Sequence, residues 1–322
     1  MPALKTDSQG VSWAGAAPVT LFSTDSFFVA RPTDTAATLN AALAQGKNLL
    51  FTPGIYHLDA TLQVSRAGTI VMGLGLTTLV PNGAIPAMTI ADVDGVKVAS
   101  LMFDAGAASS PTLLEVGEPG STRDHVTDPT SLHDIFCRVG GGTAGTAASC
   151  LTVNSNDVIG DNLWIWRADH GAGAGWTSNP AQNGLIVNGN RVTVYGLFVE
   201  HFQEYQTLWN GNGGRLFFYQ SEMPYDPPSQ AEWQHDGVNG FSSYKVSAGV
   251  TTHEAWGLGM YSVFRNPVVV ENAIETPTAP GISMHHLITV WINGATGSAI
   301  NHIINGTGAS VPAQGREARS AD

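Results

Sequence analysis

Short apolar runs recur along almost the whole chain, each bounded by glycine, asparagine, aspartate or proline. Runs such as NLLFTPG, GTIVMGLG, HDIFCRVG, RVTVYGLFVEH and HLITVWING are rich in β-branched, aromatic and aliphatic side chains, which is typical of β-strands. A helical period occurs in RPTDTAATLNAALAQGKNLL, where Leu39 and Leu43 share a face, Asp34 is a candidate N-cap and Gly46 a stop signal. The pattern therefore predicts one short helix near the start of the chain and strands after it.

Two strand architectures compete for this pattern. An antiparallel sandwich shows hairpin signals and alternating polar faces, whereas a parallel β-helix stacks short strands in coils of roughly 20 to 30 residues with polar corners. The segments DVDGVKVASLMFD, NSNDVIGDNLWIW and NGNRVTVYGLFVE repeat one design: a polar corner, a strand, a bend at a small residue and a second strand. We therefore predict an all-β fold, a right-handed parallel β-helix capped by the short helix near Asp34. We expect a lead-in at residues 1–30, the β-helix at 31–310 and a disordered tail at 311–322.

The composition agrees with this fold and narrows the class of ligand. Of 322 residues, 37 are Gly and 17 are Pro, while only 12% are charged, as expected for turn-rich β structure. A net charge of −12 with 14 Lys and Arg disfavours a nucleic-acid partner, because phosphates are bound by clustered basic groups. The scattered lysines form no obvious basic cleft for an acidic polysaccharide either. A neutral ligand suits this chain better.

The cysteines and the chain start limit other possibilities. Cys137 and Cys150 permit one disulfide, whose formation the sequence leaves open, and neither has the spacing of a metal site. No apolar run approaches the roughly 20 residues of a membrane span. The start, MPALKTDSQGVSWAG, lacks the features of a signal peptide, and we expect it to lie in the middle of a longer protein. We expect no membrane partner, no metal and no other cofactor.

Acidic and aromatic side chains concentrate between Trp164 and Trp256, in WIWRADHG, LFVEHFQEYQTLWNGNGG, FFYQSEMPYDPP and THEAWGLG. Aromatic rings stack on the apolar faces of sugars, and carboxylic acids protonate glycosidic oxygens. Glu200 and Glu222 are 22 residues apart, about one coil, so we expect them in register on neighbouring coils. Strand neighbours lie about 4.7 to 4.9 Å apart. Two carboxylates at that distance do not ionise together cheaply, so the pKa of one rises, as a general acid requires.

The same residue types also have a purely structural interpretation. Acidic and amide side chains at β-helix corners commonly bond the neighbouring backbone, and acids near aromatic rings are often surface groups. The neighbours Asp169 and His170 do not make a catalytic triad by themselves, and the pair His285 and His286 has no third metal ligand.

Two segments resemble a known family. FVEHFQEYQ and FFYQSEMPYDPP resemble the paired Val-Glu-His…Tyr-Gln and Gln-x-Glu-x-Pro-Tyr segments of glycoside hydrolase family 55, the exo-β-1,3-glucanases of fungi and bacteria. The glutamates of that family have much the same spacing as Glu200 and Glu222. RPTDTAATLNAALAQGKNLLFTPGIYHL resembles the start of the pectate-lyase-like β-helix of these enzymes. The general likeness covers about residues 30–310, and the specific motifs cover about 196–228.

The resemblance implies two tandem β-helices with the active site in the cleft between them, and an inverting hydrolysis that releases glucose from β-1,3-glucan ends. Glu222 matches the general acid, Glu200 the glutamate that supports it, and Tyr225 follows the acid in the same Pro-Tyr phrase. The chain resembles the carboxyl-terminal β-helix, so an upstream β-helix is an expected partner and would supply the water-activating residues. The resemblance also implies a secreted protein.

We therefore predict a glycoside hydrolase of the exo-β-1,3-glucanase type with a polysaccharide or oligosaccharide substrate. Predicted substrate contacts are Tyr225, Trp209, Trp256, His201, Asp169 and Asp226. One rival is a non-catalytic β-helix that binds glycan or is purely structural. The other is a polysaccharide lyase with Arg167 or Arg215 as base, often with Ca²⁺, which the acidic balance disfavours.

Overall fold

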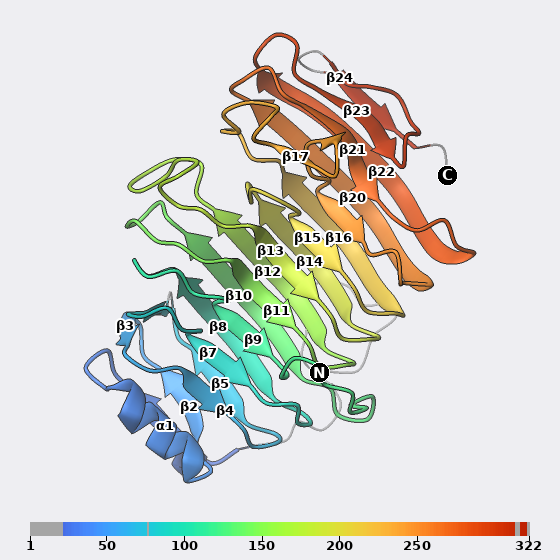
Figure 1. Ribbon diagram of the computed structural model, residues 1–322. Helices are drawn as coiled ribbons and strands as arrows, with labels where there is room; N and C mark the ends of the chain where they lie inside the picture. Colours follow the sequence, from blue (N-terminus) through green and yellow to red (C-terminus); the bar gives the residue numbers. More distant parts are fainter. Residues whose placement is uncertain (1–21, 76, 313–315, 321–322) are drawn as a thin grey trace, which may run out of the picture.

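The computed structural model describes residues 22–75, 77–312 and 316–320, which form a parallel β-helix (Figure 1). Successive coils stack through parallel strand pairs, as β12, β14 and β16 do. The larger sheet contains β1 (Phe27–Ala30), β2 (Asn48–Phe51), β5 (Ile70–Gly73), β8 (Lys97–Asp104), β10 (Ser131–Val139), β12 (Ile159–Arg167), β14 (Thr193–Glu200), β16 (Gly214–Glu222), β20 (Thr252–Phe264), β22 (Gly281–Gly294) and β24 (Arg316–Arg319), with β6 (Thr78–Pro81) paired to β8 and β3 (Ile55–Leu58) to β6.

A second sheet forms the opposite wall of the coil. Its strands are β4 (Leu62–Val64), β7 (Met88–Ile90), β9 (Leu114–Val116), β11 (Ser149–Val153), β13 (Asn183–Val187), β15 (Thr207–Trp209), β19 (Tyr244–Val246), β21 (Val269–Glu275) and β23 (Ala299–Ile304). The remaining elements are the 3-10 turn η1 (Thr24–Ser26), the helix α1 (Ala36–Ala44) and the hairpin of β17 (Gln234–His235) and β18 (Val238–Asn239). The all-β prediction with one short helix is confirmed.

Each central strand of the larger sheet bends once, at a residue in the left-handed region of φ. These residues lie at one level of neighbouring coils: Asn162 (φ 57°), Gly196 (φ 63°), Phe218 (φ 68°) and Gly257 (φ 71°). The bend divides the sheet into an amino-terminal arm before these residues and a carboxyl-terminal arm after them. This is the predicted design of a polar corner, a strand, a bend and a second strand.

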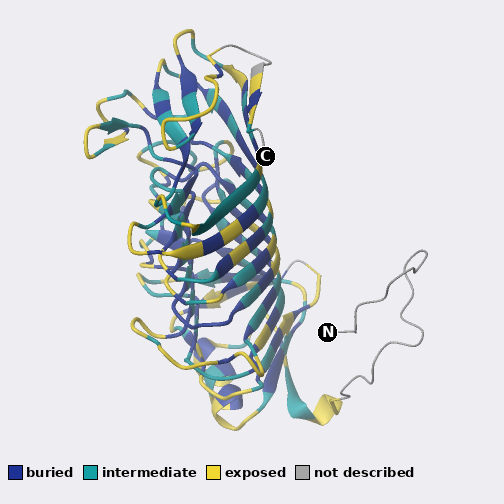
Figure 2. Ribbon diagram, turned by 90° about the vertical axis from the view of Figure 1, so that its right-hand side faces the viewer, coloured by how far each residue is buried: buried dark blue, intermediate teal, exposed yellow. Residues whose placement is uncertain are grey.

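The core is a continuous column of apolar side chains inside the coils, and buried and exposed positions alternate along the strands (Figure 2). One inward row runs across five coils, and each of its members is at most 3% exposed: Leu163, Leu197, Tyr219, Leu258 and Leu287. Burial of such rows, at about 25 cal/mol per Å² of apolar surface, holds the stack together.

Helix α1 closes the first end of this column, where it packs on β1, β2 and β4. Leu39 and Leu43 are buried there, and Gly46 (φ 79°) follows the last turn, as predicted. The predicted N-cap was wrong by one residue. The side chain of Thr35 accepts the bond from the Thr38 backbone N–H, while Asp34 instead accepts from the backbone N–H of Arg31.

The predicted boundaries need two corrections. Residues 1–21 of the lead-in lie outside the described residues, but Phe27–Ala30 pairs with β2, so the β-helix begins before residue 31. Part of the predicted tail is ordered, because β24 pairs antiparallel with β22 and covers its edge. Val311 and Ala318 are buried there, which gives this segment an apolar reason to pack.

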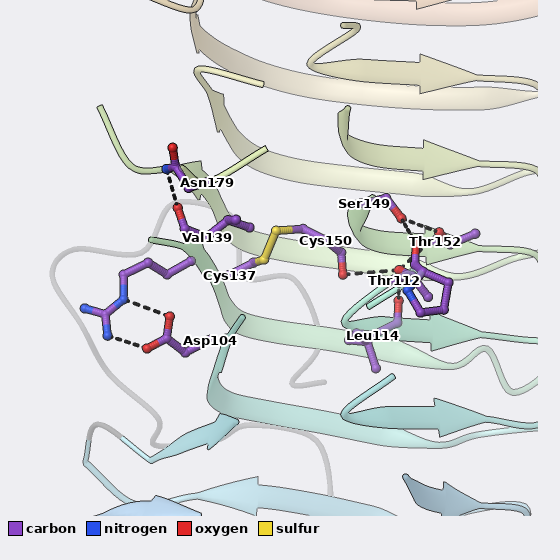
Figure 3. The surroundings of a disulfide bond; sticks show 11 residues. Asp104, Thr112, Leu114, Cys137, Val139, Ser149, Cys150, Thr152 and Asn179 are labelled. Atoms are coloured by element: carbon purple, nitrogen blue, oxygen red, sulfur yellow. Dashed lines mark hydrogen bonds and ion pairs between the residues drawn. A yellow bond between two sulfur atoms is a disulfide. The ribbon is translucent and has the colours of Figure 1, made fainter. Parts of the chain in front are cut away.

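Cys137 of β10 and Cys150 of β11 form a disulfide, the question that the sequence left open (Figure 3). The bridge joins the two sheets within one coil, with a Cα–Cα distance of 6.1 Å. Among the described residues, no helix is long and apolar enough to cross a membrane.

Candidate functional site

Glu200 and Glu222 are the last residues of β14 and β16 and lie directly opposite each other across the parallel pair. The sequence predicted this register from their spacing, and it is confirmed. Trp166 of β12 is the register partner on the other side of Glu200, and Tyr261 of β20 is the partner on the other side of Glu222. Both glutamates therefore lie at the end of the carboxyl-terminal arm.

Glu200 is the buried member of the pair, with 9% of its surface exposed. Burial raises the pKa of its carboxyl to about 7; the Trp164 indole N–H, which donates to Oε2 at 3.0 Å, opposes this rise, and the charge of Glu222 adds to it. One carboxyl of the pair was expected to hold a proton near neutral pH. In the structure the raised pKa belongs to Glu200.

Glu222 is only partly buried, so it is the member of the pair that a ligand can reach. The hydroxyl of Tyr225 donates to its Oε2, and the amide of Gln220 approaches Oε1 at 3.4 Å. Burial and the neighbouring Glu222 carboxylate raise the pKa of Tyr225, so its hydroxyl keeps the proton that it donates. Tyr225 therefore fixes the orientation of the Glu222 carboxyl.

His201 contacts Tyr225, and Asp169 lies next to His201. The His201 ring packs edge-on against Tyr225, with centroids 4.4 Å apart, and its Nδ1–H donates to the carbonyl of Met223 at 3.2 Å. Burial lowers the pKa of His201, so its imidazole is neutral. Asp169 Oδ1 lies 3.8 Å from His201 Nε2 and 2.8 Å from Nδ1 of the exposed His170. Both residues therefore lie close to the glutamates, and their contact with substrate stays a prediction.

Asp226 lies near the site but its carboxylate is already bound. Both of its oxygens accept from the Arg167 guanidinium, each at 3.0 Å. An ionised carboxylate has about four lone-pair sites, of which the Arg167 fork uses two. The substrate contact at Asp226 therefore stays a prediction.

Both predicted tryptophan contacts lie away from the glutamates, and the one at Trp209 was wrong. Trp209 is 0% exposed and belongs to the second sheet, where its ring packs beside Tyr244 inside the column. Trp256 is paired with Phe217 on the amino-terminal arm, on the other side of the bend from Glu222. It stacks between Phe217 and His285, at centroid distances of 5.0 and 5.2 Å. Neither ring lies beside the glutamates.

Other aromatic side chains lie at the site instead. A groove of about 520 Å³ runs along the outer face of the larger sheet, and its walls include Met102, Phe136, Arg138, Trp164 and Trp166. Trp164 is 46% exposed, lies 6.2 Å from Trp166 between ring centroids, and connects the groove to Glu200 through its indole N–H. The alternation in WIW, with both rings on one side of a strand, was the available signal for this surface.

The two arginines proposed for a lyase do not suit a base. Arg167 is 0% exposed and its donors are occupied by protein acceptors. Arg215 lies at the start of β16, paired with Glu254, at the opposite end of the strand from Glu222. Among the described residues no group of three or more His, Cys, Asp or Glu side chains is arranged to hold a metal ion.

A parallel β-helix with paired glutamates beside an aromatic groove has the features of a carbohydrate-active β-helix protein. The model of the LAM55 pectate lyase-like domain matches residues 27–222. The chain therefore belongs to the LAM55 family, the glycoside hydrolase family 55 that its motifs resemble.

Individual relatives agree with this assignment. The chain is 45% identical over 311 residues to an exo-β-1,3-glucanase of Streptomyces sp. (strain SirexAA-E / ActE), covering 96% of this chain and 51% of that protein. It is similar to the structure of sacteLam55A from Streptomyces sp. SirexAA-E, with a TM-score of 0.94, 43% identity, and coverage of 99% of this chain and 58% of that one. A variant of sacteLam55A in complex with glucose matches with a TM-score of 0.93 and 43% identity, over 98% of this chain and 58% of that one. The chain thus spans about half the length of these relatives.

Proposed function

We propose that this chain carries the acid side of the active site of an exo-β-1,3-glucanase, with Glu222 as the general acid. The observation that carries the proposal is the Glu200–Glu222 register pair, in which one carboxyl is buried with a pKa of about 7 and the other is only partly buried. The name of the Streptomyces relative supports β-1,3-glucan as the substrate.

Below about pH 7 the buried Glu200 carboxyl holds a proton, on the strand next to Glu222 and in register with it. A sugar bound over Glu222 removes water from it and makes its charged form less favourable. The Glu200 proton then moves to Glu222, which delivers it to the glycosidic oxygen, while Tyr225 keeps the Glu222 carboxyl oriented.

The aromatic groove suits a neutral glucan chain. Sugar rings present apolar faces that stack on indole and phenyl rings, and Trp164, Trp166 and Phe136 offer such surfaces in a groove whose Trp164 also bonds Glu200. Arg138, whose fork is bound to Asp104, leaves little free positive charge for an acidic polymer.

Glu200 is assigned to proton storage rather than to water activation. Adjacent strands lie about 4.8 Å apart, whereas inverting glycosidases separate the two catalytic carboxyls by roughly 6.5 to 9.5 Å. We infer that the water-activating groups come from an upstream β-helix, which the length of the relatives leaves room for. A disulfide, common in secreted proteins, supports a secreted location.

The test is hydrolysis of laminarin by this chain together with the upstream β-helix, with released glucose as the readout. We expect Glu222→Gln to lower kcat by about 10³-fold or more, since loss of a general acid typically costs 10²–10⁴. The matched control is Glu254→Gln. Glu254 is an exposed acid on the amino-terminal arm of β20, on the other side of the bend from Glu222, so this variant should keep full activity. Wild-type activity in Glu222→Gln would refute the assignment.

A non-catalytic glycan-binding protein is the second candidate, favoured by the fact that the chain spans about half of its relatives. Saturable quenching of tryptophan fluorescence by laminarin oligosaccharides, with no glucose released, is the result it predicts. Adding the upstream β-helix then separates the two, because a stranded half of an enzyme gains activity and a binding module does not.

A further inference from the structure

Arg167 is a buried cation whose hydrogen-bonding capacity is fully used. Its side chain is 0% exposed, and a guanidinium has five N–H donors. Nε donates to the Asn179 carbonyl at 2.9 Å, Nη1 to the His201 carbonyl at 3.0 Å, and Nη2 to the Gly175 carbonyl at 3.1 Å. The last two donors bind the Asp226 carboxylate, each at 3.0 Å.

Two of these acceptors are direct chain neighbours of the proposed active-site residues. His201 follows Glu200, and Asp226 follows Tyr225. The guanidinium therefore fixes the backbone beyond the buried glutamate and the side chain beyond the tyrosine that binds Glu222. No other described side chain bonds both of these segments.

The Tyr225 ring is held from two sides. The His201 ring lies against one side, with centroids 4.4 Å apart, and the Arg265 guanidinium lies 5.8 Å from the ring centroid. The backbone here contributes one bond, from Arg265 N–H to the Tyr225 carbonyl at 2.8 Å. Because Arg167 holds both the His201 carbonyl and Asp226, it controls the place of the ring and of its hydroxyl.

We propose that Arg167 is a positioning residue that places the Tyr225 hydroxyl against Glu222. Only an arginine fork reaches two carboxylate oxygens and three carbonyls at once; a lysine keeps the charge but has three donors on one atom. Arg167→Lys therefore releases Asp226 or the carbonyls, and the Tyr225–Glu222 bond loosens. The catalytic part of this inference rests on the proposed function, but the geometric part does not.

The geometric part is tested by ¹⁹F NMR on the full chain labelled with 3-fluorotyrosine. The protein has 7 tyrosines, and Tyr225→Phe identifies the resonance of Tyr225. Glu222→Gln should shift that resonance in the wild-type background, and the shift should be absent in the Arg167→Lys background. An equal shift in both backgrounds would overturn the proposal.

Arg191→Lys is the matched control, because Arg191 also forms a two-bond pair, with Asp157 at 2.7 and 2.9 Å, but at a corner away from the glutamates. It should leave the Tyr225 response unchanged. Asp226→Asn is the second test variant, and it should weaken the response as Arg167→Lys does. If both test variants fail to fold, the residue serves stability and the proposal is rejected.

Activity gives the catalytic part its own readout. With laminarin, Arg167→Lys should lower kcat by about tenfold or more and change the pH profile, with KM changed little. A changed KM with an unaltered kcat and pH profile would contradict a positioning role. If no glucose is released even after the upstream β-helix is added, the proposed function fails, while the NMR experiment still decides whether Arg167 sets the Tyr225–Glu222 bond.

Discussion

At the residue scale, the burial of the Glu200 carboxyl makes the stability of the protein depend on pH. Its carboxyl is buried and its pKa rises from 4.5 to about 7, so the folded protein binds this proton more tightly than the unfolded chain does. The stability from Glu200 is thus fully present below about pH 4.5 and is lost as the pH rises through 7. At pH 8 the loss amounts to about 3 kcal/mol.

Glu200→Gln is neutral at every pH and should remove this dependence. We expect the variant to lose less unfolding free energy than the wild type between pH 5 and pH 8, by up to about 3 kcal/mol. Guanidinium denaturation at the two pH values measures the difference, and Glu254→Gln serves as an exposed control. Parallel pH profiles for Glu200→Gln and the wild type would show that Glu200 ionises normally.

The glutamate pair could be predicted because residues separated by the length of one coil lie side by side on neighbouring coils. The other contacts depend on directions that the sequence does not fix. In β15, Thr207 and Trp209 point to one face of the strand and Leu208 points to the other. Both faces carry a large apolar side chain, so the pattern does not say which one faces inward. The place of Trp256 depends on where β20 bends after a long corner, and that of Asp226 on Arg167, which lies 59 residues away.

At the element scale, the coils are aligned by asparagine ladders at one corner. The triplets Asn-Ser-Asn at 154–156 and Asn-Gly-Asn at 188–190 and 210–212 follow β11, β13 and β15. The central residue faces the preceding coil closely: a Cβ on Gly189 would lie 1.9 Å from the Ser155 carbonyl oxygen. The polar corners that predicted the fold therefore have a specific use.

The third asparagine of each triplet, as at Asn190, should contribute more stability than the first, as at Asn188. The Asn190 side-chain oxygen accepts the Asn212 backbone N–H at 2.9 Å, whereas exposed Asn188 bonds the side chains of Asn154 and Asn210, each at 2.7 Å. Asn190→Ala leaves a backbone donor without its acceptor, so we expect a loss of about 1 to 3 kcal/mol. Asn188→Ala, the matched comparison, should cost less than about 1 kcal/mol. Denaturant unfolding of both variants ranks them, and the reverse order would contradict this account.

At the scale of the whole molecule, the protein is a stack in which each coil contacts chiefly its neighbours (Figure 1). Stability in such a stack is approximately a sum over coils and their interfaces. The disulfide lies within the stack, on the coil that precedes Trp164 and Trp166, and joins its two walls (Figure 3). If this coil unfolded locally, the coils next to helix α1 would no longer be packed continuously with the coils that carry the glutamates.

The bridge between Cys137 and Cys150 should therefore stabilise the molecule as a whole. It closes a loop with a sequence separation of 13, for which the unfolded chain loses entropy worth about 3 kcal/mol. We expect a reducing agent to lower the melting temperature of the wild-type protein but not that of the double variant Cys137→Ala/Cys150→Ala. The double variant should melt at a lower temperature than the oxidised wild type. Equal melting temperatures with and without reductant, together with two thiols that react in the unfolded, unreduced protein, would show that the walls are joined by packing alone.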